Sequence, residues 1–223
     1  HSKLYYDDYA PEITDAEFDQ LYDKLVAMES AQGWRDHDSP TFRVGGKAGK
    51  VTHPYPLYSL RKVYDIEEVD AFMDVRLPKI DGTNLSLIYT NGRLSRALTR
   101  GNGERGEDVT HLADVISNIP TRIDTHYDEV VINGECVTNN DVENFRNYVS
   151  GALGLKSAKE FKERNIIFIA HDWLGTEINY KARMNIVKNM GFFTVLEDDA
   201  WTYPMDGVVS VSYTHLTLPT RST

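Results

Sequence analysis

Hydrophobic residues near the start of the chain recur every three or four positions, which is the spacing of an amphipathic α-helix. Thr14 and Glu17 have the spacing of a capping box, and Gly33 is a typical stop signal, so we expect a helix between them. This small helical unit is followed by a glycine-rich stretch that has the composition of a linker. The same helical spacing predicts further helices at residues 65–73, 141–149 and 180–190.

The middle of the chain follows strand periodicity instead. Leu85, Leu87 and Tyr89 recur at every second position, with Asn84, Ser86 and Thr90 as polar residues among them, which predicts a half-buried strand. Asn91-Gly92 is a strong signal for a tight hairpin turn, so a return strand should follow it. Hairpin-joined strands mixed with helices predict an α+β fold, with antiparallel sheets flanked by helices, rather than a doubly wound parallel sheet. Further strands are expected at residues 130–137, 166–173 and 205–209.

Composition narrows the class of protein. The 223 residues are 41% hydrophobic and 26% charged, which suits one large globular domain or one domain with a small accessory unit. A net charge of -10 excludes a broad basic surface for duplex DNA, so most phosphate contacts must lie in local patches or in other modules. The single cysteine, Cys136, cannot form an internal disulfide and indicates a reducing compartment, the cytoplasm. The sequence has no apolar run of membrane-spanning length, so we expect no membrane association.

The first candidate for chemistry is the stretch Lys79-Ile80-Asp81-Gly82. A lysine at a strand edge is most often a solvated charge. Here, however, Asp81 could orient the amine, and Gly82 allows a ligand or another backbone segment to approach closely. A lysine attacks phosphorus only in its uncharged form, so a nucleophilic role requires desolvation or neighbouring cations.

The second candidate is the stretch from Thr99 to Asp108, TRGNGERGED. Its glycines permit tight turns in which several backbone N–H groups face one way, an arrangement that can cradle a phosphate. Arg100 adds a planar guanidinium suited to phosphate oxygens. The alternative is a flexible polar loop with no ligand.

These motifs, taken together and in this order, resemble the NAD-dependent DNA ligases. The nucleotidyltransferase motif Lys-x-Asp-Gly of that family matches Lys79–Gly82, and its glycine-rich run matches Thr99–Asp108. The resemblance extends from Tyr5 to Val209, and several collinear motifs are far more specific than one. Further matches are APEITDAEFD at 10–19, SPTFRVGG at 39–46, PLYSL at 56–60, NGECV at 133–137 and MDGVV at 205–209.

The resemblance implies a reaction in three steps. Lys79 would attack the adenylyl phosphorus of NAD and form lysyl-AMP with release of nicotinamide mononucleotide. AMP would then pass to the 5′-phosphate of a nick in double-stranded DNA, and the 3′-hydroxyl would displace it, as in DNA replication and repair. Such displacements rely on positioning and on charge neutralisation, with Mg²⁺ as the implied metal.

By motif position, the resemblance also implies roles for individual residues. Asp81 and Asp206 would act with Lys79, and Asp206 could also hold magnesium. The N-terminal segment, which ATP-dependent ligases lack, would bind the nicotinamide half of NAD through Tyr5, Asp15, Phe18 and Asp19; the alternative for Phe18 is a place in a core. The remaining nucleotide contacts would come from Ser59, Leu60, Arg100, Glu135, Arg146 and His171.

Several positions depart from the family pattern where that family contacts nucleotide. Leu77 replaces a glutamate, which removes an adenine contact and leaves a drier pocket. The motif lysine expected at position 211 is Val211. The other departures are Tyr6 (usually His), Phe18 (Tyr), Asn102 (Asp), Asn133 (Arg), Gly154 (Arg, with Lys156 nearby) and His171 (Tyr).

The resemblance sets expectations for domain organisation. Residues 1–46 should form the nicotinamide-binding unit and linker, and residues 47–210 an incomplete adenylation domain. Residues 211–220 resemble the translation of a transposase adapter used for sequencing libraries, so we expect 211–223 to be a non-native tail. The chain also begins at His1 inside a helical pattern, so the natural protein should extend further on both sides, with its DNA-binding modules and their zinc downstream.

Two other classes of protein remain open from the residues. One is an ATP- or GTP-using nucleotidyltransferase of the RNA ligase or capping type, which the Asp15/Asp19 segment argues against. The other is a non-catalytic NAD-binding module, which the departures favour. We expect the chain to be a monomer.

Overall fold

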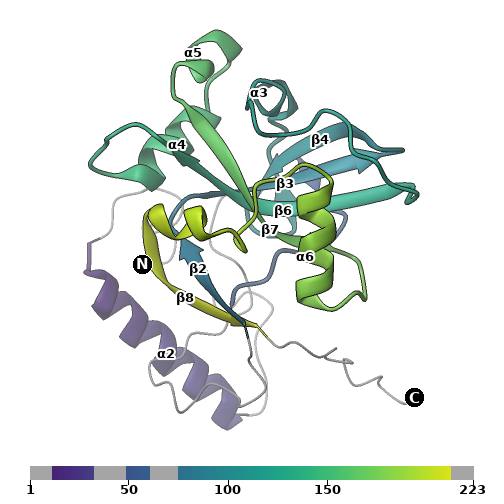
Figure 1. Cartoon of the computed structure of the whole chain (residues 1–223). Coiled ribbons are helices and arrows are strands. Elements are labelled where there is room, and N and C mark those ends of the chain that lie inside the picture. Colours follow the sequence, from purple (N-terminus) through teal and green to yellow (C-terminus); the bar gives the residue numbers. More distant parts are fainter. Residues whose placement is uncertain (1–11, 33–48, 61–74, 212–223) are drawn as a thin grey trace. The chain divides into compact units, whose positions relative to one another are not determined.

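The computed structural model describes residues 12–32, 49–60 and 75–211, and these fall into two compact units (Figure 1). The first unit holds the described residues up to Leu60 together with Arg100–Asp108. The second unit holds the described residues of 75–99 and 109–211. The expected helix at 65–73, the SPTFRVGG motif and Tyr5 lie outside the described residues.

The first unit contains helix α2 (Asp15–Gln32), which begins at the predicted capping box. The Thr14 backbone N–H donates to Glu17 Oε2 over 2.9 Å, and the Glu17 N–H donates back to Thr14 Oγ1 over 3.3 Å. The bond from the Thr14 amide is the main reason why the pKa of the Glu17 carboxyl is lowered. The unit also contains a short antiparallel pair of strands, β1 (Val51–Thr52) and β5 (Arg105–Gly106).

The second unit is built on a four-stranded antiparallel sheet with the strand order β4-β3-β6-β7. The turn between β3 and β4 is the predicted hairpin: Asn91 and Gly92 have φ values of 49° and 73°, the left-handed pair that a type I′ turn requires. The strands are β3 (Thr83–Thr90), β4 (Arg93–Thr99), β6 (Glu129–Thr138) and β7 (Ile166–Leu174).

Strand β3 is buried on both faces, so the prediction of a half-buried strand was wrong. Leu85, Leu87 and Tyr89 line the core face with no exposed surface, but Ser86 and Ile88 on the opposite face are buried as well. Ser86 tolerates burial because its hydroxyl donates to Asn133 Oδ1 over 3.0 Å. The polar residue that gave the alternating pattern is therefore satisfied inside the protein rather than by water.

A separate two-stranded sheet joins β2 (Val75–Ile80) to β8 (Met205–Val211). The lysine of the Lys-x-Asp-Gly motif lies on β2, so it belongs to a different sheet from the hairpin that follows it. Val211 is the last residue of β8 and pairs with Val75. Strands far apart in the sequence thus meet beside the larger sheet (Figure 1).

Helices cover the second unit, and α6 lies beside the edge strand β7 (Figure 1). The helix predicted at 141–149 begins later, because Asn144 accepts a hydrogen bond from the Asn147 N–H over 3.0 Å and caps it. Among the described residues, no helix combines the length and apolar content needed to cross a bilayer. The helices are α3 (Thr110–Ala113), α4 (Phe145–Leu153), α5 (Ala158–Lys162) and α6 (Tyr180–Asn189), with a 3₁₀ turn η2 at Asp198–Thr202.

Candidate active site

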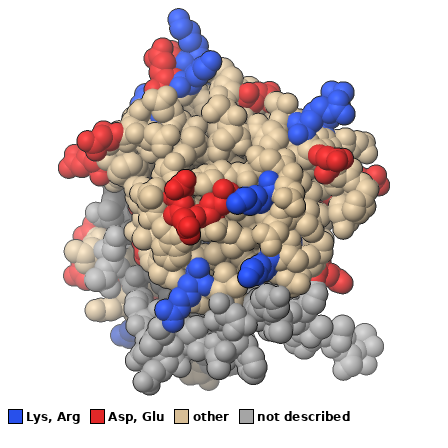
Figure 2. Space-filling model, in the orientation of Figure 1, with Lys and Arg blue, Asp and Glu red and all other residues tan. Residues whose placement is uncertain are grey.

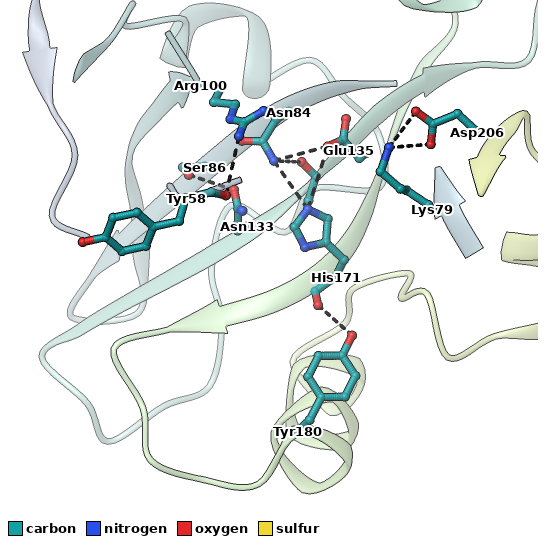
Figure 3. Close-up of polar contacts among 11 residues, drawn as sticks. Tyr58, Lys79, Asn84, Ser86, Arg100, Asn133, Glu135, His171, Tyr180 and Asp206 are labelled. Atoms are coloured by element: carbon teal, nitrogen blue, oxygen red, sulfur yellow. Dashed lines mark hydrogen bonds and ion pairs between the residues drawn. The ribbon is translucent and has the colours of Figure 1, made fainter. Parts of the chain in front are cut away.

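Lys79 and Asp206 form the most direct charged contact at the predicted site (Figure 3). The Lys79 Nζ atom lies 2.6 Å from both carboxylate oxygens of Asp206, although the two residues are 127 positions apart in the chain. Both side chains are a little over two-fifths exposed, so water and a ligand can reach the pair. The carboxylate that holds the amine is therefore that of Asp206.

A break in strand register places Asp206 at this position. Lys79 pairs with Gly207, and the next residue, Ile80, pairs with Met205, so Asp206 is an extra residue in β8. This is a β-bulge, a device that re-aims a side chain and is frequent next to active sites. Gly207 inside MDGVV, with a φ of 156°, is the local signal for this bulge, because a glycine within a strand often marks one. The sequence analysis did not use it.

The other two residues of the lysine motif have mainly backbone contacts. The Asp81 N–H donates to the Pro204 carbonyl over 2.8 Å, which ties the end of β2 to the start of β8. A Cβ atom on Gly82 would lie 2.4 Å from the Cys136 carbonyl oxygen, so this glycine is required by a neighbouring backbone segment. The catalytic role assigned to Asp81 stays a prediction.

A second group of polar side chains lies on one face of the large sheet: Asn84 on β3, Glu135 on β6 and His171 on β7 (Figure 3). Asn84 Nδ2 donates to the Gly134 carbonyl over 3.1 Å and lies 3.4 Å from both Glu135 Oε1 and His171 Nε2. Glu135 Oε1 and His171 Nε2 are 3.9 Å apart. Glu135 and His171, both predicted nucleotide contacts, thus lie next to Asn84, which the sequence analysis did not identify.

Asn84 could have been suspected from its place, because it is a polar residue between Gly82 and the apolar run of β3. Its Oδ1 atom is buried and makes no hydrogen bond within the described structure. A buried amide oxygen without a donor is costly, and it is commonly satisfied by a water molecule or a ligand. The Asn84 side chain is therefore positioned to receive a hydrogen bond at this face.

Arg146, the remaining predicted residue of this unit, is exposed in the first turn of α4. Its carbonyl accepts a bond from Thr83 Oγ1 over 3.3 Å, which links α4 to the first residue of β3. The Arg146 side chain is exposed to solvent. Its assigned contact with the nucleotide stays a prediction.

In the first unit, Arg100, a predicted nucleotide contact, lies close to Ser59, which was predicted to line the NAD pocket. Arg100 Nη2 lies 3.4 Å from Ser59 Oγ and 3.5 Å from the Tyr58 carbonyl. Leu60, also predicted to line this pocket, is 61% exposed. Their contacts with NAD stay predictions.

The phosphate cradle considered for the stretch from Thr99 to Asp108 is not available at residues 102–105. The N–H groups of Asn102 and Gly103 donate to carbonyls within the loop, and those of Glu104 and Arg105 donate to Asn102 Oδ1. These four amides are already used and are not available to a phosphate. Gly101 serves the turn instead: its φ is +55°, and a Cβ there would lie 1.9 Å from the Arg105 carbonyl oxygen.

The nicotinamide-side residues are described only in part. Phe18 on α2 is 6% exposed, and its ring stacks against that of Tyr22 with 6.4 Å between centroids. Burial of Phe18 agrees with the alternative that it belongs to a core. Asp15 and Asp19 lie on α2, but their side chains are outside the described part, so their role stays a prediction.

The donor set suits a magnesium ion held partly by substrate. Among the described residues, no three His, Cys, Asp or Glu side chains gather in a ready-made metal site. Mg²⁺ needs no such cage, because it is commonly bound by one or two carboxylates together with substrate phosphates. The accessible carboxylate of Asp206 fits that pattern.

Comparison with known families decides the identity. The model of the NAD-dependent DNA ligase adenylation domain matches residues 46–215, and that of the DNA ligase-like, N-terminal NAD+-binding domain matches residues 1–45. The chain belongs to the NAD-dependent DNA ligase family. This confirms the predicted family and the α+β adenylation fold, and Lys79 lies within the part that matches the adenylation domain.

Curated relatives of the family named DNA ligase support the assignment. Those of Chlorobium phaeovibrioides, Brachyspira hyodysenteriae and Bacteroides fragilis are 32%, 35% and 36% identical to this chain. The matches cover 87%, 88% and 81% of this chain but 36%, 34% and 33% of the relatives. The chain thus spans about a third of the length of the DNA ligases that it matches.

A solved structure titled "Archaeal ATP-dependent RNA ligase - form 2" also aligns with 60% of this chain and 31% of its own. Its sequence identity is 16% and its TM-score 0.31, which is too low to bear on fold or function.

Proposed function

We propose that this chain transfers AMP from NAD to Lys79, which is the first step of NAD-dependent DNA ligation. The observation that carries the proposal is the Lys79 amine, exposed to ligand and held 2.6 Å from Asp206 inside a matched adenylation domain. In this step the Lys79 nitrogen forms a bond to the adenylyl phosphorus. The pyrophosphate P–O bond breaks, and nicotinamide mononucleotide leaves with the bonding electrons.

Asp206 has two parts in the proposal. Its carboxylate orients the Lys79 side chain and is the nearest base that can accept the proton that the ammonium must lose before its nitrogen attacks phosphorus. When magnesium is bound, Asp206 and the phosphate oxygens would hold it, and the ion would neutralise negative charge on the phosphates. Asp81 follows directly in the same motif and is proposed to act beside this pair.

Glu135, Asn84 and His171 form the proposed nucleotide face. Glu135 would accept hydrogen bonds from the ribose hydroxyls, and His171 would lie beside the adenine. Arg146, Arg100, Ser59 and Leu60 are proposed to complete the adenylate contacts. The nicotinamide half would be bound by Tyr5, Asp15, Phe18 and Asp19.

In a full-length relative the AMP would pass on to a nick in double-stranded DNA. We propose that this chain acts as a monomer in the cytoplasm, in line with its single buried cysteine. The departure at Leu77 is compatible with the scheme, because that side chain is 5% exposed and belongs to the core.

The test is incubation of the chain with adenine-labelled NAD and magnesium, followed by detection of label bound covalently to protein. We expect labelled protein, and Lys79→Ala should abolish it because the nucleophile is gone. Lys162→Ala, an exposed lysine on α5, is the matched control and should label normally.

The same assay separates the alternatives. Label transferred from ATP but not from NAD would support a nucleotidyltransferase of another donor class. Binding of NAD with no covalent label would support a non-catalytic module. Either result would overturn the proposed reaction.

A further inference from the structure

A second β-bulge, on strand β7, determines where His171 points. Asn133 of β6 pairs with Asp172, and the next residue, Gly134, pairs with Ala170, so the register shifts at His171. It is the extra residue of the bulge, and its ring lies beside Asn84 and Glu135 (Figure 3). A bulge disrupts the regular ladder locally, so contacts from outside the ladder help to fix the bulged segment.

The exposed edge of β7 is the place where that support is needed. β7 is the outer strand of the sheet, so its outward backbone groups have no neighbouring strand. The outward groups of Ala170 are paired in an isolated bridge to Thr194. The Ala170 N–H donates to the Phe193 carbonyl over 2.8 Å, and the Ala170 carbonyl accepts from the Val195 N–H over 3.0 Å. The carbonyl of His171 is the next group along the edge.

Helix α6 supplies the partner of that carbonyl. The Tyr180 hydroxyl donates to the His171 carbonyl oxygen over 2.8 Å (Figure 3). Tyr180 is buried, and burial, followed by the charge of Asp172, raises the pKa of its phenol. The phenol therefore stays protonated and can donate its hydrogen bond to the His171 carbonyl.

The same helix also holds the residue after the bulge. Arg183 Nη2 forms an ion pair with Asp172 Oδ1 over 2.7 Å, and both side chains are mostly buried. The Arg183 guanidinium lies 5.1 Å from the centre of the Tyr180 ring, so the two supports also contact each other. A second bond, from the Trp173 N–H to Asp172 Oδ1 over 2.9 Å, fixes the carboxylate from the strand itself.

We propose that Tyr180 and Arg183 are positioning residues that hold the β7 bulge and thereby aim His171 at the nucleotide face. Tyr180 fixes the carbonyl of His171, and Arg183 fixes the neighbouring Asp172. This inference rests on the proposed function in one respect only, namely that the face with Glu135 and Asn84 receives the adenosine half of NAD.

The proposal makes α6 part of the nucleotide site although neither residue touches the nucleotide. Loss of either support leaves His171 able to take other orientations. The nucleotide would then bind less often to a correctly arranged site, while the chemistry at Lys79 would be unchanged. The effect should appear in the NAD concentration that gives half the maximal rate of lysyl-AMP formation in a single turnover, and not in that maximal rate.

The first experiment compares Tyr180→Phe with Tyr89→Phe. Tyr89 is the matched control because it is also a buried tyrosine that donates to a backbone carbonyl, that of Pro120 over 2.6 Å, but on the core face of β3. We expect Tyr180→Phe to raise the NAD concentration for half-maximal single-turnover adenylylation roughly 3- to 10-fold, the loss associated with one hydrogen bond. Tyr89→Phe should leave that concentration unchanged while lowering the stability of the chain.

The second experiment reads His171 directly and needs no activity. In protein labelled with ¹⁵N-histidine, the side-chain resonances of His171 are identified by their loss in His171→Gln. Tyr180→Phe should shift them more than those of any other histidine, and Tyr89→Phe should not. Arg183→Met should act like Tyr180→Phe, whereas Arg183→Lys, which keeps the charge, should restore most of the wild-type signal.

The two readouts keep the two proposals apart. If the wild-type chain forms no lysyl-AMP, the proposed function fails, but the histidine spectra still test the positioning. If His171 resonances stay in place in Tyr180→Phe and Arg183→Met, or move equally in Tyr89→Phe, the positioning role is wrong. Should Tyr180→Phe not fold, the Arg183 pair of variants decides the question alone.

Discussion

At the scale of single residues, Cys136 is the clearest case in which burial controls chemistry. Its side chain has no exposed surface, and burial raises the pKa of the thiol, with a smaller contribution from the Glu135 carboxylate. A thiol reacts with alkylating agents as the thiolate, so a raised pKa and lack of access both protect it. The residue is thus structural rather than reactive.

We predict that iodoacetamide leaves Cys136 unmodified in the folded chain at pH 8 and modifies it fully in urea, as mass spectrometry would measure. The raised pKa of the Cys136 thiol also makes the stability of the chain depend on pH. The unfolded thiol ionises near its ordinary value of 9.0 while the folded one does not, so stability should fall as the pH rises above that value. Modification of the native chain at the rate of a free thiol would contradict the assignment.

Gly134, between Asn133 and the predicted ribose contact Glu135, makes a second prediction at this scale. A Cβ at this position would lie 2.4 Å from the Phe168 ring and 2.5 Å from the Ile169 carbonyl oxygen, and the latter cannot move without breaking the sheet. Gly134→Ala should therefore lower the free energy of unfolding by about 1–3 kcal/mol.

Urea denaturation of Gly134→Ala would measure this loss. Gly151→Ala is the control, because α4 leaves open space around that glycine. It should instead raise the stability of the chain by up to about 1 kcal/mol, since alanine has the higher helix propensity. Equal effects of the two substitutions would show that backbone entropy, not crowding, governs both positions.

At the scale of elements, the sequence was informative where a structure is specified locally. The Thr14/Glu17 box and the Asn91-Gly92 turn are formed by neighbouring residues, and both occur where they were expected. The pairing of β2 with β8 is a contact between distant segments, so no local pattern could predict it. The register shift of each bulge depends on the partner strand in the same way, although Gly207 gave a local signal for the bulge on β8.

In the candidate site, too, local motifs could be read from the sequence, whereas contacts between distant segments could not. The motifs located Lys79, Asp206, Glu135 and His171, but they did not say which of them would meet. The role of Asn84 depends on its position opposite Glu135 in the sheet, which is a property of strand register. Phe18, read from its motif as a ligand contact, is buried, which shows that a motif position does not by itself establish exposure.

At the scale of the whole molecule, the net charge of the chain bears differently on adenylation, which needs NAD, and on ligation, which needs duplex DNA. The chain has a net charge of -10. On the face shown in Figure 2, the lysines and arginines of the described residues form small separate groups rather than a continuous stripe. NAD needs only a local site, whereas tight binding to duplex DNA requires many phosphate contacts.

We therefore predict that this chain becomes adenylated but does not seal a labelled nick in duplex DNA in the presence of NAD and magnesium. Gel electrophoresis under denaturing conditions would detect any joined strand. A full-length NAD-dependent ligase is the positive control. Efficient sealing by the chain alone would show that its few basic groups suffice to hold the nick.

The 127-residue separation between Lys79 and Asp206 has a consequence for synthesis on the ribosome. The lysine strand is translated long before the strand that pairs with it, and the hairpin, β6 and β7 all emerge in between. A nascent chain halted before residue 205 has Lys79 but not the Asp206 carboxylate that contacts it. Under the proposed reaction, self-charging with AMP would be reserved for chains in which this distant strand has been made and has docked.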